Sequence, residues 1–257
     1  MEIPQLPEEG FVLHFNKPKY WTSFQLVGAV RYKLTRKYKS RKVKVGHAGT
    51  LDPLASGVMI LCVGRATKQI ESFQYQTKEY VATLMLGATT PSFDMEKPID
   101  EVYPTEHITR EKIEEVLQQF VGHVMQVPPV FSACKVNGER AYDLARKGEE
   151  VELQAKPLVI DEIELMECNL PTIVIRVVCS KGTYIRALAR DIGTALDSGA
   201  HLTDLVRTRI GEVTLDKCIQ VEDFESEIGE MRIVKRIKSY DEEDLHFDSE
   251  ESEIENR

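Results

Sequence analysis

A chain of 257 residues with 42% hydrophobic content can bury one large core or two small ones, and none of its apolar runs approaches the roughly 20 residues that span a bilayer. The N-terminus, MEIPQLPEEG, lacks the pattern of a signal peptide, and the five widely spaced cysteines include no CxxC pair, so we expect a soluble cytoplasmic protein without a zinc site or disulfide framework. The net charge of -9 argues against a nucleic-acid-binding protein, but the acidic residues are concentrated at one end of the chain. Residues 221–257 hold 14 of the 42 acidic and 5 of the 33 basic residues, which leaves 28 of each, and no net charge, in residues 1–220.

The beginning of the chain has the pattern of a strand followed by a helix. Residues 11–18, ended by Pro18, predict a strand, and residues 22–34 predict a helix. Its apolar stripe consists of Leu26, Val27, Val30 and Leu34. The segment RYKLTRKYKSRKVK (31–44) then has eight Lys or Arg residues, interleaved tyrosines and no acid. It is either a surface that contacts phosphates or a solvated helix face.

The remaining elements indicate a mixed α+β domain. Stretches rich in β-branched residues and bounded by turn formers predict strands at 58–64, 79–87, 158–168 and 172–180. Apolar residues at intervals of three to four predict helices at 109–122 and 183–197. Strands and helices in this order are typical of the α+β class.

Three segments differ in composition from this domain, which we expect to span residues 1–220. Residues 123–152 are rich in Pro, Gly, Lys and Arg and predict an insertion over a site. Residues 221–239 predict a short C-terminal extension, and the alternation of basic and apolar residues at 231–240 predicts an edge strand. Residues 240–257 are acidic and poor in apolar residues, which predicts a disordered tail.

The segment KVGHAGTLDPLASGV (44–58) holds one carboxylate, Asp52, in a loop of turn-forming residues. Pro53 fixes a backbone dihedral, and Gly49 and Gly57 permit tight turns on either side, so the loop can hold the carboxylate rigidly. An isolated Asp-Pro usually does no more than organise a turn. This whole segment, however, resembles the signature GHxGTLDPxAxGVL of the TruB family of tRNA pseudouridine synthases.

Four other segments resemble the same family, in the order in which the family has them. They are NKPKYWTSFQLVGAVR, KEYVATLMLGATTPSFD, PPVFSACKVNGERAYDLARKG and CSKGTYIRALARDIG, so the resemblance covers residues 12 to about 210. Two departures are visible: Asn16 stands where an acidic residue is common, and TTPSFDMEKP replaces a stretch closer to TDTxDxxG. We expect them to affect only local loop contacts.

The resemblance implies a fold, a reaction and a substrate. The fold is a mixed, largely antiparallel sheet flanked by helices, with residues 123–152 as a thumb-like RNA-contacting insertion. The reaction converts uridine 55 in the T loop of tRNA to pseudouridine without metal or cofactor. We expect a monomer with no obligatory protein partner. The chain after residue 210 is too short for the complete C-terminal PUA domain that many members carry.

The resemblance also assigns the residues of the active site. Asp52 matches the catalytic aspartate, and Arg186 the arginine that pairs with it and keeps it charged. Tyr80 matches the tyrosine that stacks on the uracil and whose hydroxyl serves in proton transfer. Tyr184 and Leu205 match residues that surround the base. Whether the carboxylate forms a covalent adduct or promotes elimination to a glycal is left open by the sequence.

RNA recognition is assigned to a histidine and a basic segment. His47 matches the histidine that stacks where the flipped base had been. The residues expected to contact phosphates are Arg36, Lys37, Lys39, Arg41 and Lys44.

Two other classes of protein are alternatives to the synthase. A non-catalytic tRNA-binding or RNA-folding module with a synthase-like body would not require Asp52, Tyr80 and Arg186 together. A metal-dependent hydrolase would need clustered acids or histidines, whereas Asp52 has no carboxylate or second histidine near it in sequence.

Overall fold

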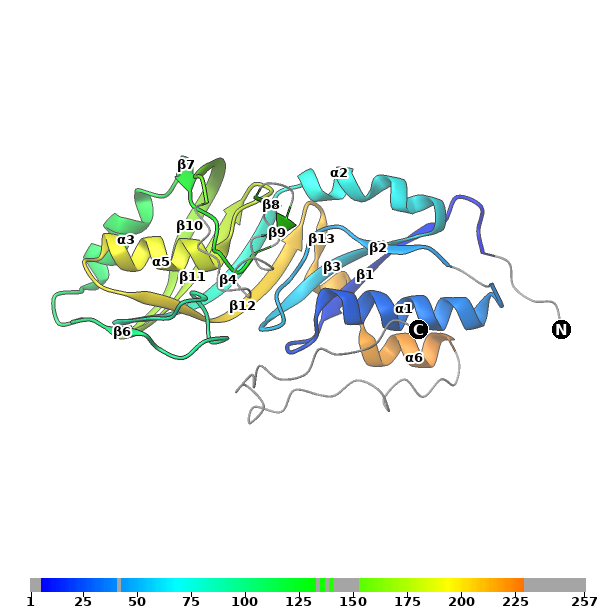
Figure 1. Cartoon of the computed structure of the whole chain (residues 1–257), viewed down its shortest axis with the longest axis horizontal. Coiled ribbons are helices and arrows are strands. Elements are labelled where there is room, and N and C mark those ends of the chain that lie inside the picture. Colours follow the sequence, from blue (N-terminus) through cyan, green and yellow to red (C-terminus); the bar gives the residue numbers. More distant parts are fainter. Residues whose placement is uncertain (1–5, 41–42, 133–134, 137–138, 141–152, 229–257) are drawn as a thin grey trace.

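The computed structural model describes residues 6–40, 43–132, 135–136, 139–140 and 153–228 (Figure 1). Within them, a ten-stranded sheet has the main order β14-β1-β3-β12-β4-β11-β10-β7, with β13 paired to β12 and β2 to β3. Its strands are β1 (Phe11–Lys17), β2 (Val45–His47), β3 (Ala55–Val63), β4 (Lys78–Leu86), β7 (Gly122–Gln126), β10 (Lys156–Asn169), β11 (Thr172–Cys179), β12 (Ala200–Ile210), β13 (Val213–Thr214) and β14 (Ile219–Gln220). Apart from the parallel pairs β1–β14 and β3–β12, neighbouring strands are antiparallel.

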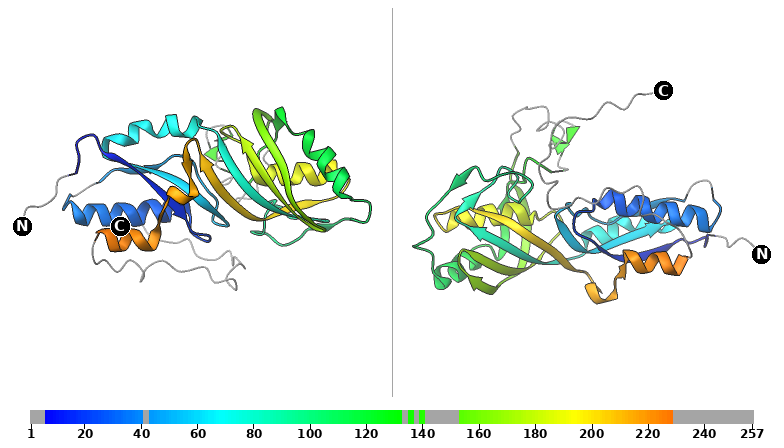
Figure 2. Two further views of the ribbon diagram at one scale, coloured as in Figure 1. Left: turned by 180° about the vertical axis from the view of Figure 1, so that it is seen from behind. Right: turned by 90° about the horizontal axis from the view of Figure 1, so that it is seen from below.

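Helices cover both ends of this sheet (Figures 1 and 2). They are α1 (Ser23–Lys37), α2 (Ile70–Tyr75), α3 (Arg110–Gln118), α5 (Ile185–Ala195) and α6 (Val221–Ile228), with 3-10 turns η1 (Gly64–Gln69) and η2 (Leu215–Lys217). Two short ladders join β5 (Ala88–Thr89) to β6 (Glu101–Val102) and β8 (Lys135–Val136) to β9 (Glu139–Arg140). The predicted mixed, largely antiparallel α+β fold is therefore confirmed. None of the described helices is long and apolar enough to cross a membrane.

The predicted elements are present, with differences at their ends. The helix predicted at 22–34 continues to Lys37, and the one predicted at 109–122 ends at Gln118. The helix predicted at 183–197 begins at Ile185, because Tyr184 is its N-cap in an extended conformation. The sequence did not reveal the long central strand β12, or several short elements, among them η1, α2, β2, β14 and α6.

Two of the compositional segments join the main domain in part. Residues 122–126 form β7 at the edge of the sheet, so the predicted 123–152 insertion begins later than expected. In α6, the Phe224 ring packs edge-on against Phe15 of β1, with ring centroids 5.0 Å apart. Most of the predicted insertion, the edge strand at 231–240 and the tail at 240–257 lie outside the described residues.

Helix α1 anchors the loop that carries Asp52. Its N-cap Thr22 forms a capping box with Gln25, and its predicted apolar stripe is buried. The Ser23 hydroxyl donates to the Leu51 carbonyl at 2.8 Å and accepts from the Leu51 N–H at 2.9 Å. The start of the helix is thereby fixed to the residue directly before Asp52.

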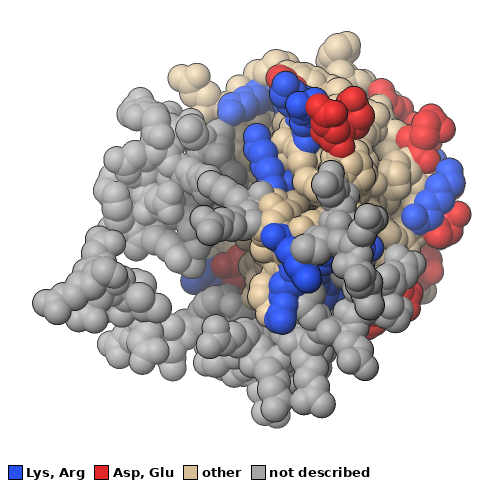
Figure 3. All heavy atoms as spheres, turned by 90° about the vertical axis from the view of Figure 1, so that its right-hand side faces the viewer, with Lys and Arg blue, Asp and Glu red and all other residues tan. Residues whose placement is uncertain are grey.

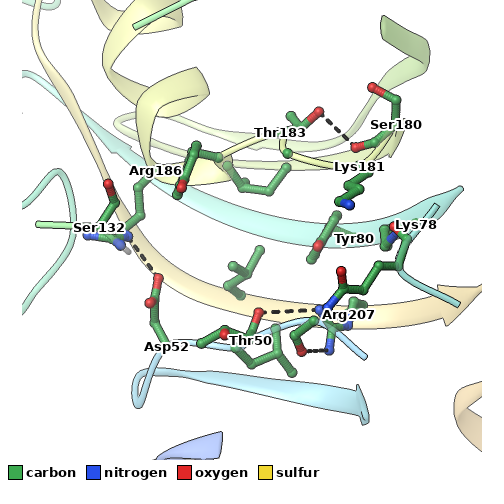
Figure 4. A pocket seen from close by; sticks show the side chains of 17 residues that line it. Thr50, Asp52, Lys78, Tyr80, Ser132, Ser180, Lys181, Thr183, Arg186 and Arg207 are labelled. Atoms are coloured by element: carbon green, nitrogen blue, oxygen red, sulfur yellow. Dashed lines mark hydrogen bonds and ion pairs between the residues drawn. The ribbon is translucent and has the colours of Figure 1, made fainter. Parts of the chain in front are cut away.

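Helix α5 packs closely against β12 and positions Arg186. Its residues Leu188, Ile192 and Leu196 are buried, as the spacing predicted. Gly193 allows the close approach, because a Cβ there would lie 2.4 Å from the Ala200 nitrogen. Arg186 is in the first turn, so this packing directs it toward the loop of Asp52 (Figure 4).

Candidate active site

A cavity of about 320 Å³ lies between the Asp52 loop, β4, β12 and the turn that leads into α5 (Figure 4). Five residues predicted from the sequence line it: Asp52, Tyr80, Tyr184, Arg186 and Leu205. They come from four separate segments of the chain, and the fold brings them together. The cavity is also lined by Arg207, which the sequence reading did not single out.

The Asp52 carboxylate is partly exposed at the cavity, while its loop is held firmly. The backbone of the loop is fixed on both sides of Asp52, because the Ala55 N–H donates to the Asp52 carbonyl at 3.1 Å and the Tyr20 N–H donates to the Pro53 carbonyl at 2.7 Å. The side chain retains 41% exposure, and its Oδ2 lies 2.9 Å from Nε of Arg186. The carboxylate is thus paired on one side and open to a ligand on the other.

Arg186 is the centre of a buried polar cluster. Its guanidinium donates to the Ser92 carbonyl at 3.3 Å and to the Phe131 carbonyl at 3.0 Å. Nε also lies 3.6 Å from Oδ2 of Asp94, a buried carboxylate. These contacts in one plane fix the guanidinium against Asp52 and exclude the alternative of an exposed helix arginine.

Asp94 belongs to the stretch TTPSFDMEKP, and its position corrects an expectation. We expected the departure there to affect only local loop contacts, but the loop reaches Arg186 through both Ser92 and Asp94. Burial raises the pKa of Asp94, with the Arg186 charge acting in the opposite direction. The pKa of Glu96 is raised as well, first by burial and then by the charge of Asp94.

Tyr80 lies at the other end of the cavity, beside Arg207 (Figure 4). It is buried on β4, and desolvation raises the pKa of its phenol. Arg207 is 1% exposed and donates to main-chain carbonyls around the Asp52 loop.

Lys17 is a second buried cation near the loop. Desolvation lowers its pKa to about 7, and the charge of Asp52 partly opposes this shift. Its Nζ donates to the Pro18 carbonyl at 2.9 Å and to the Trp21 carbonyl at 2.6 Å.

Comparison with known proteins identifies the family of this chain. Residues 35–185 match the TruB family pseudouridylate synthase N-terminal domain, and residues 186–241 match the tRNA pseudouridylate synthase B C-terminal domain. The chain belongs to the TruB family. Over 226 residues it is 69% identical to the tRNA pseudouridine synthase B of Phocaeicola vulgatus and 72% identical to that of Parabacteroides distasonis, in each case over 88% of this chain and 96% of the relative.

Solved structures support the same fold. A Cbf5-Nop10-Gar1 complex contains a chain with a TM-score of 0.62 and 28% identity, aligned over 84% of this TruB-family chain and 53% of that chain. An H/ACA RNP bound to a substrate RNA containing 2'-deoxyuridine gives a TM-score of 0.60 and 26% identity, over 86% and 58% of the two chains. This chain therefore spans little more than half the length of those solved chains. The predicted pseudouridine synthase fold is confirmed.

His47 lies in β2, outside the residues that line the cavity of this TruB-family chain. Its ring is 5.8 Å from the Phe24 ring, at an interplanar angle of 88°. Phe24 is 68% exposed in the first turn of α1, next to the anchored loop. The sequence reading missed Phe24, because an aromatic residue beside an apolar stripe is usually read as core.

Two of the predicted basic residues, Arg36 and Lys37, lie in the last turn of α1, at the far end of this helix from the Asp52 loop. Arg36, Lys37, Lys39 and Lys44 are exposed, whereas Arg41 lies outside the described residues. Since α1 rises 1.5 Å per residue, its last turn lies about 20 Å from the first turn beside the Asp52 loop. Figure 3 shows Lys and Arg side chains on this end of the molecule, with acidic side chains beside some of them and along one edge.

Among the residues that the structure describes, no group of three or more His, Cys, Asp or Glu side chains is arranged to hold a metal ion. The carboxylates of Asp52 and Asp94 converge on the guanidinium of Arg186 instead. Their charge is thus balanced, in part, by a side chain of the protein itself.

Proposed function

We propose that this TruB-family chain converts uridine 55, in the T loop of tRNA, to pseudouridine, with Asp52 as the catalytic carboxylate. The observation that carries the proposal is the ion pair of 2.9 Å between Asp52 and the buried Arg186 at the edge of the cavity. The names of the relatives, tRNA pseudouridine synthase B, support tRNA as the substrate. We also propose that the enzyme acts in the cytoplasm as a monomer.

The reaction is an isomerisation in which no atom is gained or lost. The bond between N1 and C1' of the uridine breaks, the uracil turns within the cavity, and C5 forms a bond to C1'. The proton lost from C5 is balanced by the proton gained at N1. An ionised carboxylate beside C1' promotes the first step, either by forming an adduct or by removing a proton from the ribose.

Arg186 orients the Asp52 carboxylate and balances its charge, because Nε lies 2.9 Å from Oδ2. The guanidinium is itself fixed by the carbonyls of Ser92 and Phe131. When RNA covers the exposed side of Asp52, this preorganised pair remains to hold the charge.

The cavity walls suit a flipped uracil. Tyr80 and Leu205 are buried on adjacent strands and offer an aromatic and an aliphatic surface to the base, with Tyr184 at the entrance to α5. A uridine in a folded T loop must leave its stack before C1' is accessible. His47, with the exposed Phe24 beside it, then provides rings on which the remaining bases stack.

The basic residues Arg36, Lys37, Lys39, Arg41 and Lys44 contact phosphates of the tRNA in this proposal. Arg36 and Lys37 suit contacts along the stem rather than with the target nucleotide, because most of the length of α1, about 20 Å, separates them from the Asp52 loop. The part of the predicted 123–152 insertion that follows β7 acts as the thumb that closes on the loop in this proposal.

The test is to incubate the protein with an unmodified tRNA transcript and to map pseudouridine by carbodiimide-blocked primer extension. We expect one new stop, at position 55, that persists in EDTA and is missing from a transcript with cytidine at that position. Tight binding of the transcript without any stop would instead favour a non-catalytic tRNA-binding or RNA-folding module. Activity lost in EDTA and restored by a divalent metal would favour metal-dependent chemistry.

A further inference from the structure

We propose that Arg207 is a positioning residue, which orients the Tyr80 hydroxyl so that its proton is donated to the uracil in the cavity. The inference rests on the proposed function. It adds that the Tyr80 hydroxyl donates its hydrogen bond to the base instead of accepting one from it. It concerns a cation that the sequence reading did not single out.

The first observation is the environment of the Arg207 guanidinium. Its Nε donates to the Val58 carbonyl at 2.8 Å, Nη2 to the Gly49 carbonyl at 3.2 Å and Nη1 to the Thr50 carbonyl at 3.5 Å. These carbonyls flank Asp52 on both sides of its loop. Within the described part of the chain, no carboxylate forms an ion pair with Arg207, which is 1% exposed. A buried cation therefore stands in the cavity wall without a counter-ion.

The second observation is the register of β12 and β4. Arg207 and Tyr80 are directly opposite each other in this antiparallel pair, and both are buried and line the cavity. Directly opposed residues on one face of a sheet have Cβ atoms about 5 Å apart. Figure 4 shows the two side chains at one end of the cavity, with Asp52 and Arg186 at the other.

The chemistry of the two groups fixes the direction of their interaction. A guanidinium has five N–H donors and no acceptor, and three of the donors of Arg207 are directed to carbonyls. The Tyr80 oxygen can interact with the remaining donors only as an acceptor. Its single proton is then left to point into the cavity, where the substrate carries acceptors.

A donor at this position assists the bond cleavage. When N1 separates from C1', the bonding electrons remain on the uracil and spread over its ring nitrogens and the oxygens O2 and O4. A hydrogen bond from Tyr80 to one of these oxygens becomes stronger as that charge develops. The positive charge of the buried Arg207 acts in the same direction.

A purely structural role for Arg207 is the alternative, since its three bonds also fasten the Asp52 loop. A double-mutant cycle separates the two roles. Tyr80→Phe, Arg207→Gln and the double variant are compared in single-turnover reactions with saturating enzyme and a tRNA transcript, after thermal melts have shown that each is folded. Arg209→Gln is the matched control, because this cation on the same strand pairs with Glu79 instead.

If Arg207 acts through Tyr80, each single variant slows the reaction about 10- to 100-fold and the double variant is little slower than the slower single variant. Arg209→Gln stays within threefold of wild type. Effects that multiply in the double variant would show that Arg207 acts through the loop alone and would overturn the proposal.

A second measurement requires no activity, so it keeps the proposal testable if the substrate is another RNA or if Arg207→Gln is inactive. A fluorinated tyrosine, which ionises at lower pH than tyrosine, is placed at residue 80 and titrated by fluorine NMR in the free protein. Removing a nearby cation raises the pKa of a phenol, so the midpoint should move to higher pH in Arg207→Gln and stay nearly constant in Arg207→Lys and Arg209→Gln. An unchanged midpoint in Arg207→Gln would refute the proposed interaction.

Discussion

The buried Arg186 guanidinium allows a quantitative prediction for the substitution Arg186→Lys. Arginine makes its contacts to Asp52, Ser92 and Phe131 from three different nitrogens in one plane. A lysine ammonium is a compact charge on a flexible stem and cannot reproduce that fork. If it stays with Asp52, the carbonyls of Ser92 and Phe131 lose their donor, at about 1–3 kcal/mol for each buried group.

The expected decrease in rate follows from these hydrogen bonds. If the loss of these hydrogen bonds raises the activation free energy by about 3–4 kcal/mol, the chemical step slows about 150- to 1,000-fold, because about 1.4 kcal/mol corresponds to a factor of ten in rate. Because the charge is kept, the affinity for tRNA should change by no more than a few fold. The rate is measured in single turnovers with enzyme in excess, and binding is measured by filter retention.

The matched control is Arg190→Lys, one turn further along α5. Arg190 is a partly exposed arginine that donates to the Val127 carbonyl at 3.1 Å and stacks over the Phe93 ring, and it does not line the cavity. Its substitution should leave the rate within threefold of wild type. A rate within threefold of wild type for Arg186→Lys, or weaker binding that alone accounted for its slower reaction, would refute this role of Arg186.

Three further predictions concern recognition, the loop and pH. Replacing Arg36, Lys37 and Lys39 together by Gln should weaken tRNA binding and reduce the slope of log K against log salt by about one for each phosphate that the protein no longer neutralises, while an unchanged slope would identify a solvated helix face. Gly57→Ala should lower the free energy of unfolding by more than about 2 kcal/mol, because φ is +108° there and a Cβ would lie 2.2 Å from the Arg207 carbonyl oxygen. Gly28→Ala is the control and should be neutral or stabilising, because a Cβ there would have no atom within 4 Å. Equal urea midpoints for the two variants would contradict this prediction. Wild-type stability should rise with pH above about 7, the folded-state pKa of Lys17, because the unfolded lysine keeps its proton up to about pH 10.4. Urea unfolding at several pH values should show a smaller rise in Lys17→Met, and an identical rise would mean that Lys17 stays charged in the fold.

The sequence was most informative where a regular pattern or a rare motif was present. The apolar stripe of α1 was predicted from the helical spacing of its residues, and the structure shows these residues buried. The convergence of Asp52, Tyr80 and Arg186 on one cavity was expected from family resemblance, since no spacing relates three segments so far apart in the chain. Short elements such as β2 and β14 were missed, because two or three residues carry no detectable periodicity. The long strand β12 was missed as well, because two register irregularities in its pairing with β4 break the period of two.

Buried charges were the main gap in the prediction. Arg207 and Arg209 are two residues apart on β12, a spacing that places both side chains on one face of a regular strand. A register irregularity lies between them in the pairing with β4, and only Arg207 is buried, which the sequence does not reveal. A possible signal was the pair Gly49 and Gly57, because a glycine in a rigid loop often marks a close approach; a Cβ at Gly57 would meet the backbone of Arg207. Asp94 stands where the pattern TDTxDxxG has its second aspartate, but it was missed because a carboxylate in an irregular loop gives no sign of its burial beside Arg186.

The role of Asp52 is tested most directly by the release of the proton from C5 of the target uridine, which must leave when C5 bonds to C1'. A tRNA transcript with tritium at C5 of its uridines is mixed with excess wild-type protein or Asp52→Asn, and tritium in water is counted over time. We predict release of one equivalent per tRNA by the wild type and none above background by Asp52→Asn, although the variant, which keeps the shape of the side chain, binds the transcript within a few fold. Release by Asp52→Asn at a rate close to that of the wild type would contradict the assignment of Asp52 as the catalytic carboxylate.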